Sequence, residues 1–287
     1  MFANSRSPVV LTLRSAWRRR LALPHDHGAW VFLLGPLLIG LFAIPAPRTA
    51  WLPVGLVIVA ALAAFLLRQP ASIAVKALSG RRPRADLAPA ALWAGLYGLL
   101  GLAALAGLTA SGFGFLLLLA APAAPMFIWH LWLISRRQER RRLGLALVGA
   151  SVLALAAPAG LWVRAGWADP AGWWLWLLAW LQSAASIVYA YLRLAQRDWP
   201  AVPALKQRLR PAWRALACTT ANLLLAAGLG VAGWLPPALP LPFAVQWLET
   251  IYGALRPAVG ARPVLIGLRQ LAVSSLFTLL FIVAWRW

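Results

Sequence analysis

Long apolar runs, separated by short basic or proline-containing segments, fill this sequence from residue 28 to its end. A run of about 20 apolar residues is long enough to cross a bilayer as a helix. Hydropathy and the positions of proline, glycine and charge predict nine such spans. They cover residues 28–46, 51–67, 88–108, 113–134, 143–164, 172–193, 211–232, 241–254 and 264–285. The chain is therefore predicted to be an all-α, polytopic membrane helical bundle.

The composition excludes a water-soluble fold. Of 287 residues, 62% are hydrophobic and only 11% are charged, where a soluble domain has about 25% charged residues. We expect a basic tail over residues 1–23 and a single transmembrane domain over residues 24–287. Span 241–254 is short and contains Gln246, Glu249 and Thr250, so the bundle has eight spans if this segment lies at the membrane interface.

Lysine and arginine are distributed unevenly between the two sides of this bundle. All but three of the 27 basic residues fall on the side of the N-terminal tail, and the exceptions are Arg48, Arg164 and Arg286. The positive-inside rule then predicts a cytoplasmic N-terminus and, with nine spans, an external C-terminus. The net charge of +21 is divided among loops at one bilayer face, so we expect no nucleic-acid partner.

Two long basic loops, residues 68–87 and 193–212, follow the second and the sixth span. Their offset of four helices has two explanations. One is an internal repeat of two halves, 24–134 and 143–254, followed by a last helix, 264–285. The other is membrane topology alone, which also places basic loops on the cytoplasmic side.

Polar side chains form stripes within several predicted spans, although a charge at the centre of a membrane helix costs roughly 2.5–3.5 kcal/mol. Gln182, Ser186, Tyr189 and Arg193 follow at offsets of 4, 7 and 11, so they share one helix face. Further polar groups of other spans are His130, Arg214, Cys218, Asn222, Gln246, Glu249, Arg269, Gln270, Ser274 and Thr278. Their predicted position in the cytoplasmic half favours a polar cavity open to the cytoplasm, and hydrogen bonding between packed helices is the alternative.

Glu249 is the one carboxylate that falls within a predicted span. A buried carboxylate needs a partner or becomes neutral, so we predict an ion pair with Arg269 or Arg256. Without that pair, Glu249 would be a candidate proton-coupling group.

The segment Pro24-His25-Asp26-His27-Gly28-Ala29-Trp30 resembles the opening signature of the YwiC-like family of bacterial integral membrane proteins. Arg68-Gln69-Pro70 and Gly267-Leu268-Arg269-Gln270-Leu271 also resemble that family. The resemblance implies a bacterial cytoplasmic (inner) membrane and a role for His27, but it implies no particular reaction.

The nine-helix layout with two cytoplasmic loops is also similar to that of the UbiA-type intramembrane prenyltransferases. Those enzymes hold a magnesium diphosphate with Asp-rich motifs, whereas the two loops here contain only Asp86 and Asp198. Because magnesium needs oxygen ligands, the resemblance implies a similar scaffold with different chemistry. Residues two apart on a helix, such as His25 and His27, point to nearly opposite sides. We expect neither a metal ion nor a cofactor.

Three functions remain open from the sequence. The first is a cationic cavity that binds an anionic amphiphile, a polyprenyl phosphate or a phospholipid, with transferase activity as an option. The others are a proton-coupled transporter of small solutes that uses Glu249, and a non-enzymatic assembly or anchoring protein without an identified protein partner. The predicted binding residues are Arg68, Lys76, Gln182, Tyr189, Arg193, Asn222, Glu249, Arg269 and Gln270, and the predicted acid or base is His27 or His130.

Overall fold

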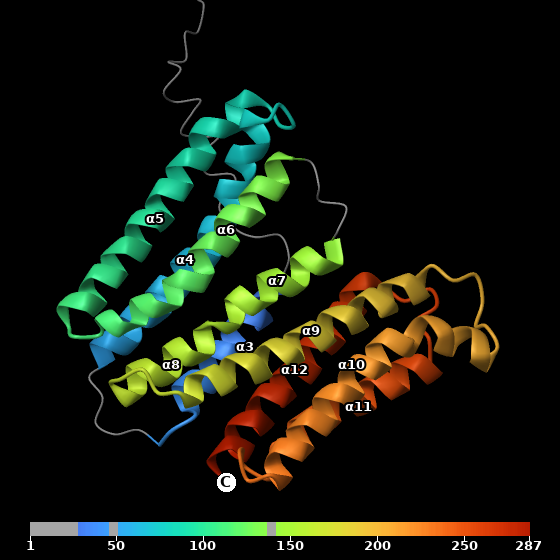
Figure 1. The fold of residues 1–287 in the computed structure, drawn as a ribbon. Helices are drawn as coiled ribbons and strands as arrows, with labels where there is room; N and C mark the ends of the chain where they lie inside the picture. The colour runs from blue at the N-terminus through green and yellow to red at the C-terminus, as the bar shows by residue number, and fades with distance from the viewer. Residues whose placement is uncertain (1–27, 46–50, 137–141) are drawn as a thin grey trace, which may run out of the picture. The chain divides into compact units, whose positions relative to one another are not determined.

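The computed structural model describes residues 28–45, 51–136 and 142–287 (Figure 1). Over these ranges the regular structure is entirely helical. Seven helical segments of the described residues are long and apolar enough to cross a membrane: Trp51–Leu78, Arg84–Ala110, Gly114–Ser135, Leu143–Ala165, Ala171–Arg197, Leu205–Val231 and Pro263–Arg286. Two shorter helices, Ala29–Phe42 and Pro240–Leu255, match the other two expected spans. The protein is thus a polytopic helical membrane protein, as predicted.

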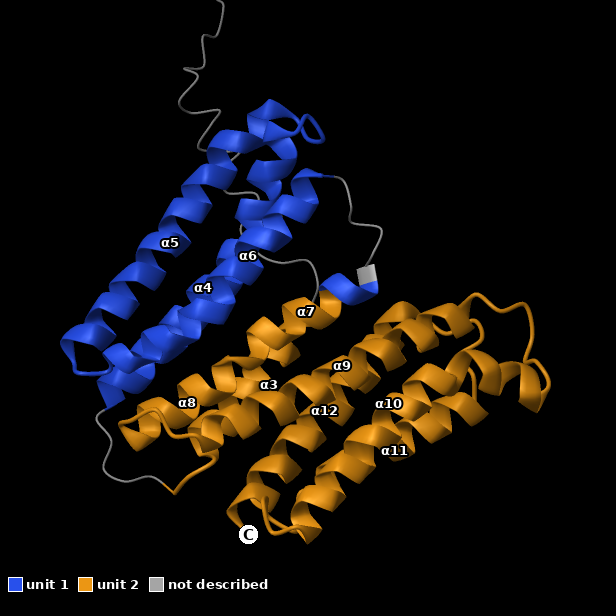
Figure 2. Cartoon of the chain, in the orientation of Figure 1, with its two compact units in different colours: residues 1–27, 50–145 blue, residues 28–49, 146–287 orange. Residues whose placement is uncertain are grey.

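The chain divides into two compact units, which Figure 2 colours separately. Unit 1 contains three main helices, α4 (Trp51–Leu78), α5 (Leu87–Ala110) and α6 (Ala120–Ser135), with short 3-10 helices η1 (Arg84–Asp86) and η2 (Gly114–Leu119). Helix α4 packs along α5 and α6. Near one end, Ile73 of α4 and Ala90 of α5 form a small buried cluster with Ala74 and Trp93.

Helix α4 corrects one expectation from the sequence. Residues 68–87 were expected to form a loop, but α4 continues through Pro70 to Leu78. Arg68 and Lys76 therefore lie on a helix. The backbone N–H and C=O groups of a helix bond to one another, so polar residues after the apolar stretch do not end the helix. Pro70 removes only one intrahelical donor, and Ser72 donates to the neighbouring carbonyl of Arg68 at 2.7 Å.

Unit 2 comprises residues 28–49 and 146–287. Its helices are α3 (Ala29–Phe42), most of α7 (Arg142–Ala154), α8 (Ala156–Ala165), α9 (Ala171–Arg197), α10 (Leu205–Val231), α11 (Pro240–Leu255) and α12 (Pro263–Arg286). Helix α9 is the centre of this unit, because it packs against α3, α8, α10, α11 and α12. The predicted repeat of two halves stays a prediction.

Helices α3 and α8 cross with their backbones in contact. A side-chain carbon on Gly40 would collide with the carbonyl oxygen of Ala157, and one on Gly160 would lie 2.7 Å from the backbone nitrogen of Leu41. Membrane helices are held by close packing rather than by a hydrophobic driving force, so small residues at a crossing increase the contact. These two glycines therefore fix α3 in unit 2.

The helical segment made by α7 and α8 is broken at Leu155. The N–H of Leu155 bonds to Val152 at 3.1 Å instead of to Ser151, its partner in a regular α-helix. The indole N–H of Trp176 on α9 donates to the carbonyl of Ser151 at 2.9 Å, and that of Trp180 donates to Leu147 at 3.1 Å. Two tryptophans thus satisfy backbone groups at and near the break.

Candidate functional site

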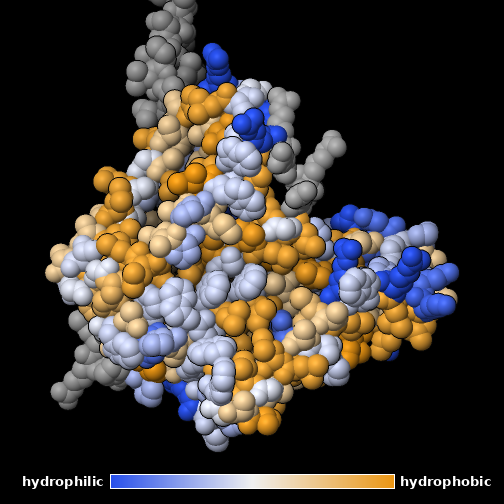
Figure 3. All heavy atoms as spheres, viewed as in Figure 1, coloured by the Kyte–Doolittle hydropathy of each residue, from blue (hydrophilic) through white to orange (hydrophobic). Residues whose placement is uncertain are grey.

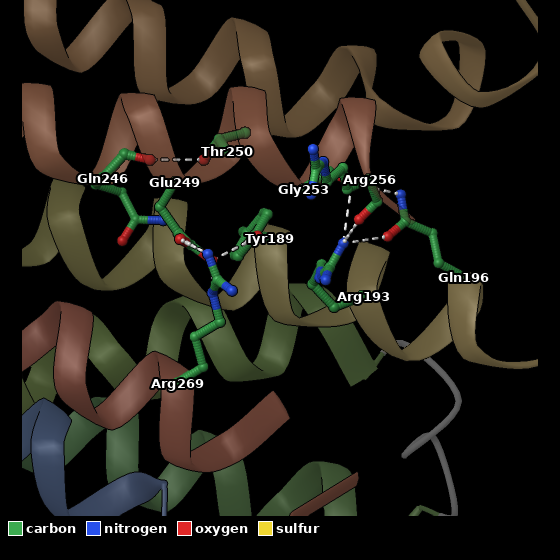
Figure 4. A network of polar contacts seen from close by, with 9 residues as sticks. All are labelled: Tyr189, Arg193, Gln196, Gln246, Glu249, Thr250, Gly253, Arg256 and Arg269. Carbon is green, nitrogen blue, oxygen red and sulfur yellow. Dashed lines mark hydrogen bonds and ion pairs between the residues drawn. The ribbon is translucent and has the colours of Figure 1, made fainter. Parts of the chain in front are cut away.

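A row of polar side chains lies where α9, α11 and α12 meet in unit 2 (Figure 4). We call this row the polar seam. Its α9 residues are spaced four, three, four and three residues apart, so they lie along one face of the helix. The seam consists of Gln182, Ser186, Tyr189, Arg193 and Gln196 of α9, Gln246 and Glu249 of α11, the carbonyls of Gly253 in α11 and of Arg256 directly after it, and Arg269 of α12.

One end of the seam consists of neutral groups. The amide nitrogen Nε2 of Gln182 donates to Oε1 of Gln246 at 3.2 Å and to Oγ of Ser186 at 3.3 Å. Ser186 in turn donates to Oε1 of Gln246 at 3.3 Å. Gln182 Oε1 and Gln246 Nε2 remain buried without a hydrogen-bond partner among the described residues. Because an unsatisfied buried group costs about 1–3 kcal/mol, these two atoms require an explanation.

An ion pair occupies the middle of the seam. Arg269 binds Glu249 with two hydrogen bonds, from Nε to Oε1 at 2.7 Å and from Nη2 to Oε2 at 2.8 Å. The hydroxyl of Tyr189 also donates to Oε1 of Glu249, at 2.8 Å. The predicted pairing of Glu249 with Arg269 is confirmed.

The two partners of this pair differ in exposure. The Glu249 side chain is 8% exposed, whereas that of Arg269 is 44% exposed. The guanidinium of Arg269 lies 4.2 Å from the ring centroid of Tyr252, within the range of a cation–π interaction. The carboxylate is thus enclosed, and the guanidinium reaches the surface of the unit.

The other end of the seam caps the C-terminus of α11. Nη1 of Arg193, a residue that is 9% exposed, donates to the carbonyls of Gly253 at 3.0 Å and Arg256 at 2.7 Å. Gln196 donates to Gly253 at 3.1 Å, and Arg208 donates to the carbonyl of Leu255 at 2.5 Å. The last carbonyls of a helix have no intrahelical donor and carry partial negative charge. Arg193 therefore has a structural partner in the helix end.

The remaining predicted site residues lie elsewhere. Asn222 of α10 donates to the carbonyl of Leu181 on α9 at 2.9 Å, so it joins two helices. Gln270 of α12 has a buried Oε1 without a hydrogen-bond partner in the described residues. Arg68 and Lys76 on α4, and His130 on α6, belong to unit 1 and are not part of the seam. His27 lies outside the described residues.

Two residues of this region were missed by the sequence-based prediction. Gln196 is fully buried and joins Arg193 to the end of α11. It lies on the same helix face as Gln182, one turn after Arg193. It was missed because the predicted span ended at residue 193, whereas α9 continues to Arg197. Ser183 was missed because it lies beside the stripe rather than on it, and it faces the cavity described next.

A small cavity of about 20 Å³ lies between α3, α9 and α12. Its polar lining residues are Gln182, Ser183, Ser186, Ser274 and Thr278. This volume is sufficient for one water-sized occupant and insufficient for a lipid headgroup. A second, open groove of about 460 Å³ lies on α10 and is lined by Arg210, Pro211, Trp213 and Arg214.

Part of the chain matches a known protein family. Residues 23–159 match the family model described as YwiC-like protein. No curated protein and no solved structure matches this chain. The match includes the Pro24–Trp30 signature, but it ends before α9, so the polar seam and the similar segment Gly267–Leu271 lie outside it. The layout similar to UbiA-type enzymes stays a prediction. The resemblance of this chain to the YwiC-like family is thus confirmed over residues 23–159.

Proposed function

We propose that this membrane protein binds an anionic amphiphile, a polyprenyl phosphate or an anionic phospholipid, with its charged headgroup at Arg269. The observation that carries the proposal is the 44% exposure of the Arg269 side chain while it is paired with the enclosed Glu249. Glu249 and Tyr252 orient this guanidinium before a ligand arrives. Such a preorganised donor loses less entropy when it binds an anion.

The donor count of the guanidinium supports a headgroup at this position. Glu249 uses Nε and Nη2 of Arg269, and a guanidinium has five N–H donors in total. The Nη1 donors are therefore suited to a phosphate oxygen. Arginine binds phosphate through this planar arrangement of donors more specifically than lysine does.

Apolar residues around Arg269 suit the chain of an amphiphile. Leu265 and Leu268 of α12 are 58% and 60% exposed, and Leu248 and Leu255 of α11 are 58% and 46% exposed. In a membrane these side chains face acyl chains. A ligand with a charged head and a long hydrocarbon tail would match a cation bordered by such a surface.

The proposed location of the site is the cytoplasmic half of a bacterial inner membrane, with the N-terminus in the cytoplasm and the C-terminus outside. On the face seen in Figure 3, hydrophilic residues gather over the end of unit 2 where α9 ends and α10 begins. Five basic residues lie in this segment: Arg197, Lys206, Arg208, Arg210 and Arg214. The positive-inside rule assigns that end to the cytoplasm.

The proposal concerns binding. The predicted roles of Arg68 and Lys76 in holding the anion, and of His27 or His130 as acid or base in a transfer reaction, stay predictions. The assembly or anchoring function also stays a prediction.

Native mass spectrometry of the gently solubilised protein tests the proposal, with phosphatidylglycerol, a polyprenyl phosphate and zwitterionic phosphatidylcholine as probes. Glu249→Gln keeps an acceptor oxygen that can orient Arg269 but removes the negative charge that repels an anion, so we expect this variant to bind the anionic probes several-fold more tightly. Arg269→Ala combined with Glu249→Gln leaves no unpaired buried charge, and it should lose this binding. Binding that survives this double substitution but is lost in Arg210→Ala/Arg214→Ala would assign the headgroup to the α10 groove and overturn the proposal.

A second candidate is proton-coupled transport of a small solute, and Glu249 is the observation that favours it. Among the acidic residues of the described ranges, only Glu249 lies in the middle of a helix, where it is 8% exposed. Carboxylates in such positions commonly mark proton paths. Uptake of a panel of small solutes into proteoliposomes under a pH gradient, lost in Glu249→Gln, would support this function. Uptake that does not depend on the gradient would exclude proton coupling.

A further inference from the structure

The polar side chains among the lining of the cavity between α3, α9 and α12 mainly accept hydrogen bonds, and the rest of the lining is apolar. Ser183 donates its hydroxyl proton to the carbonyl of Ala179 at 2.8 Å, and Thr278 donates to Ser274 at 2.9 Å. Ser186 donates to Gln246. With these protons engaged, the three hydroxyl groups have only oxygen lone pairs to offer an occupant.

Two further oxygen atoms add to this set. Oε1 of Gln182 is buried without a partner among the described residues, in a side chain that is 5% exposed. Ser274, which is 8% exposed, contributes another hydroxyl group to the lining. One water molecule can donate only two hydrogen bonds, so it would satisfy a minority of these acceptors.

Helix α3 has a backbone carbonyl without its regular donor among the residues that line the cavity. Pro36 lies inside α3 and lines the cavity. Since proline has no N–H, the carbonyl of Phe32, four residues earlier, loses its regular helical donor. Phe32 also lines the cavity. In lipid an unsatisfied carbonyl costs several kcal/mol unless another group pairs with it.

The lining determines the charge of an occupant. Every described residue that lines the cavity is uncharged, and oxygen atoms are the ligands that hard cations prefer. Without a carboxylate, the lining would not repay the large desolvation cost of a divalent ion. We propose that the oxygen atoms of Gln182, Ser183, Ser186, Ser274 and Thr278, with the Phe32 carbonyl, form a binding site for one small monovalent cation, with Na⁺ as the natural probe.

Thermal unfolding of the full-length protein in detergent tests this site, with NaCl, KCl and choline chloride compared at equal ionic strength. A ligand that binds only the folded state raises Tm in a saturable way. We expect Na⁺, or K⁺ in its place, to raise Tm by a few degrees relative to choline. Equal Tm in all three salts would show that water alone fills the cavity and would overturn the proposal.

Matched substitutions locate the effect. Thr278→Val removes a cavity hydroxyl, whereas Thr219→Val removes a hydroxyl of α10 that makes the same kind of bond, to Ala215 at 2.9 Å, outside the lining. Thr278→Val should raise the cation concentration that gives the same increase in Tm roughly tenfold. Thr219→Val should leave this concentration unchanged. Equal loss in both variants would contradict the site. If Thr278→Val does not fold, radiolabelled Na⁺ binding to the unaltered protein, with choline as competitor control, decides the question.

Discussion

The guanidinium of Arg269 binds both carboxylate oxygens of Glu249, with bonds of 2.7 Å from Nε and 2.8 Å from Nη2. Such bidentate pairs fix orientation as well as distance. Since the Tyr189 hydroxyl binds the same carboxylate at 2.8 Å, the contact joins α9, α11 and α12. All side chains of the polar seam come from these three helices.

Removing one partner of this pair should cost more stability than removing both. Arg269→Ala leaves the Glu249 charge enclosed, and for a fully buried pair this costs roughly 3–5 kcal/mol. Because the Arg269 side chain is 44% exposed, we expect about half of that. Glu249→Ala/Arg269→Ala should regain part of the loss. Unfolding in mixed micelles with increasing SDS measures the free energies, and Arg262→Ala, at an exposed position, is the control.

Arg193→Ala should destabilise the end of α11 locally. The carbonyls of Gly253 and Arg256 would lose a charged donor, which is typically worth about 1.5–3 kcal/mol. We expect faster amide hydrogen exchange in α11 and in the segment that leads to α12. The control is Arg210→Ala, an exposed position on α10. Unchanged exchange in Arg193→Ala would contradict the capping role of this residue.

Gly160→Ala should separate α3 from α8. The new methyl group would meet the Leu41 nitrogen at 2.7 Å and the Gly40 carbonyl carbon at 2.9 Å. Overpacking of this kind costs typically 1–3 kcal/mol. Gly267→Ala on α12, where a methyl group would have no neighbour within 4 Å, should be neutral or slightly stabilising. A lower Tm for Gly267→Ala than for Gly160→Ala would refute the close crossing.

Trp176→Phe should weaken the contact of α9 with the broken α7–α8 segment. The substitution retains an aromatic ring but removes the donor to the Ser151 carbonyl, and the loss of a typical hydrogen bond costs about 1 kcal/mol, more if the carbonyl stays buried. Trp167→Phe, at a side chain that is 54% exposed, serves as the comparison. Equal Tm for the two variants would mean that the indole bond contributes nothing.

The proposed orientation predicts which side of the membrane a thiol reagent reaches. In a Cys218→Ser background, Lys206→Cys should react with a membrane-impermeant maleimide only after the cells are permeabilised. Ser111→Cys, between α5 and η2, should react in intact cells. Both side chains are exposed in the structure. Labelling of Lys206→Cys in intact cells, with Ser111→Cys labelled only after permeabilisation, would contradict the proposed orientation.

Hydropathy was sufficient to predict the helices, but not where they end. Each of the nine expected spans has a helical counterpart within the described residues. Apolar runs reflect the thickness of the bilayer, whereas helix ends depend on backbone hydrogen bonds that extend into water. This is why α4 and α9 continue past their predicted ends and why Gln196 was missed.

The sequence also limited the partner of Glu249 to Arg269 or Arg256, because a buried carboxylate needs a partner, and the pair that forms is with Arg269. It did not predict the role of Arg193. The acceptors of Arg193 are main-chain carbonyls, and a main-chain carbonyl has no signature in the residue types. Arg81 and Arg286 likewise donate to carbonyls at helix ends, to Ile134 in the last turn of α6 and to Phe42 at the end of α3. Arginines that the sequence shows only as positive charges thus have a second, geometric role in the structure.

A membrane crossing by α11, as the sequence predicts for span 241–254, would affect the surrounding lipid. Its 16 residues extend about 24 Å at 1.5 Å per residue, less than the roughly 30 Å hydrocarbon thickness of a typical bilayer. Arg193 and Arg208 supply donors to its last carbonyls, so that end does not need water. The bilayer beside α11 would become locally thinner to match the length of the helix. Each ångström of mismatch costs a modest free energy. The protein would therefore partition preferentially into thinner regions of the membrane.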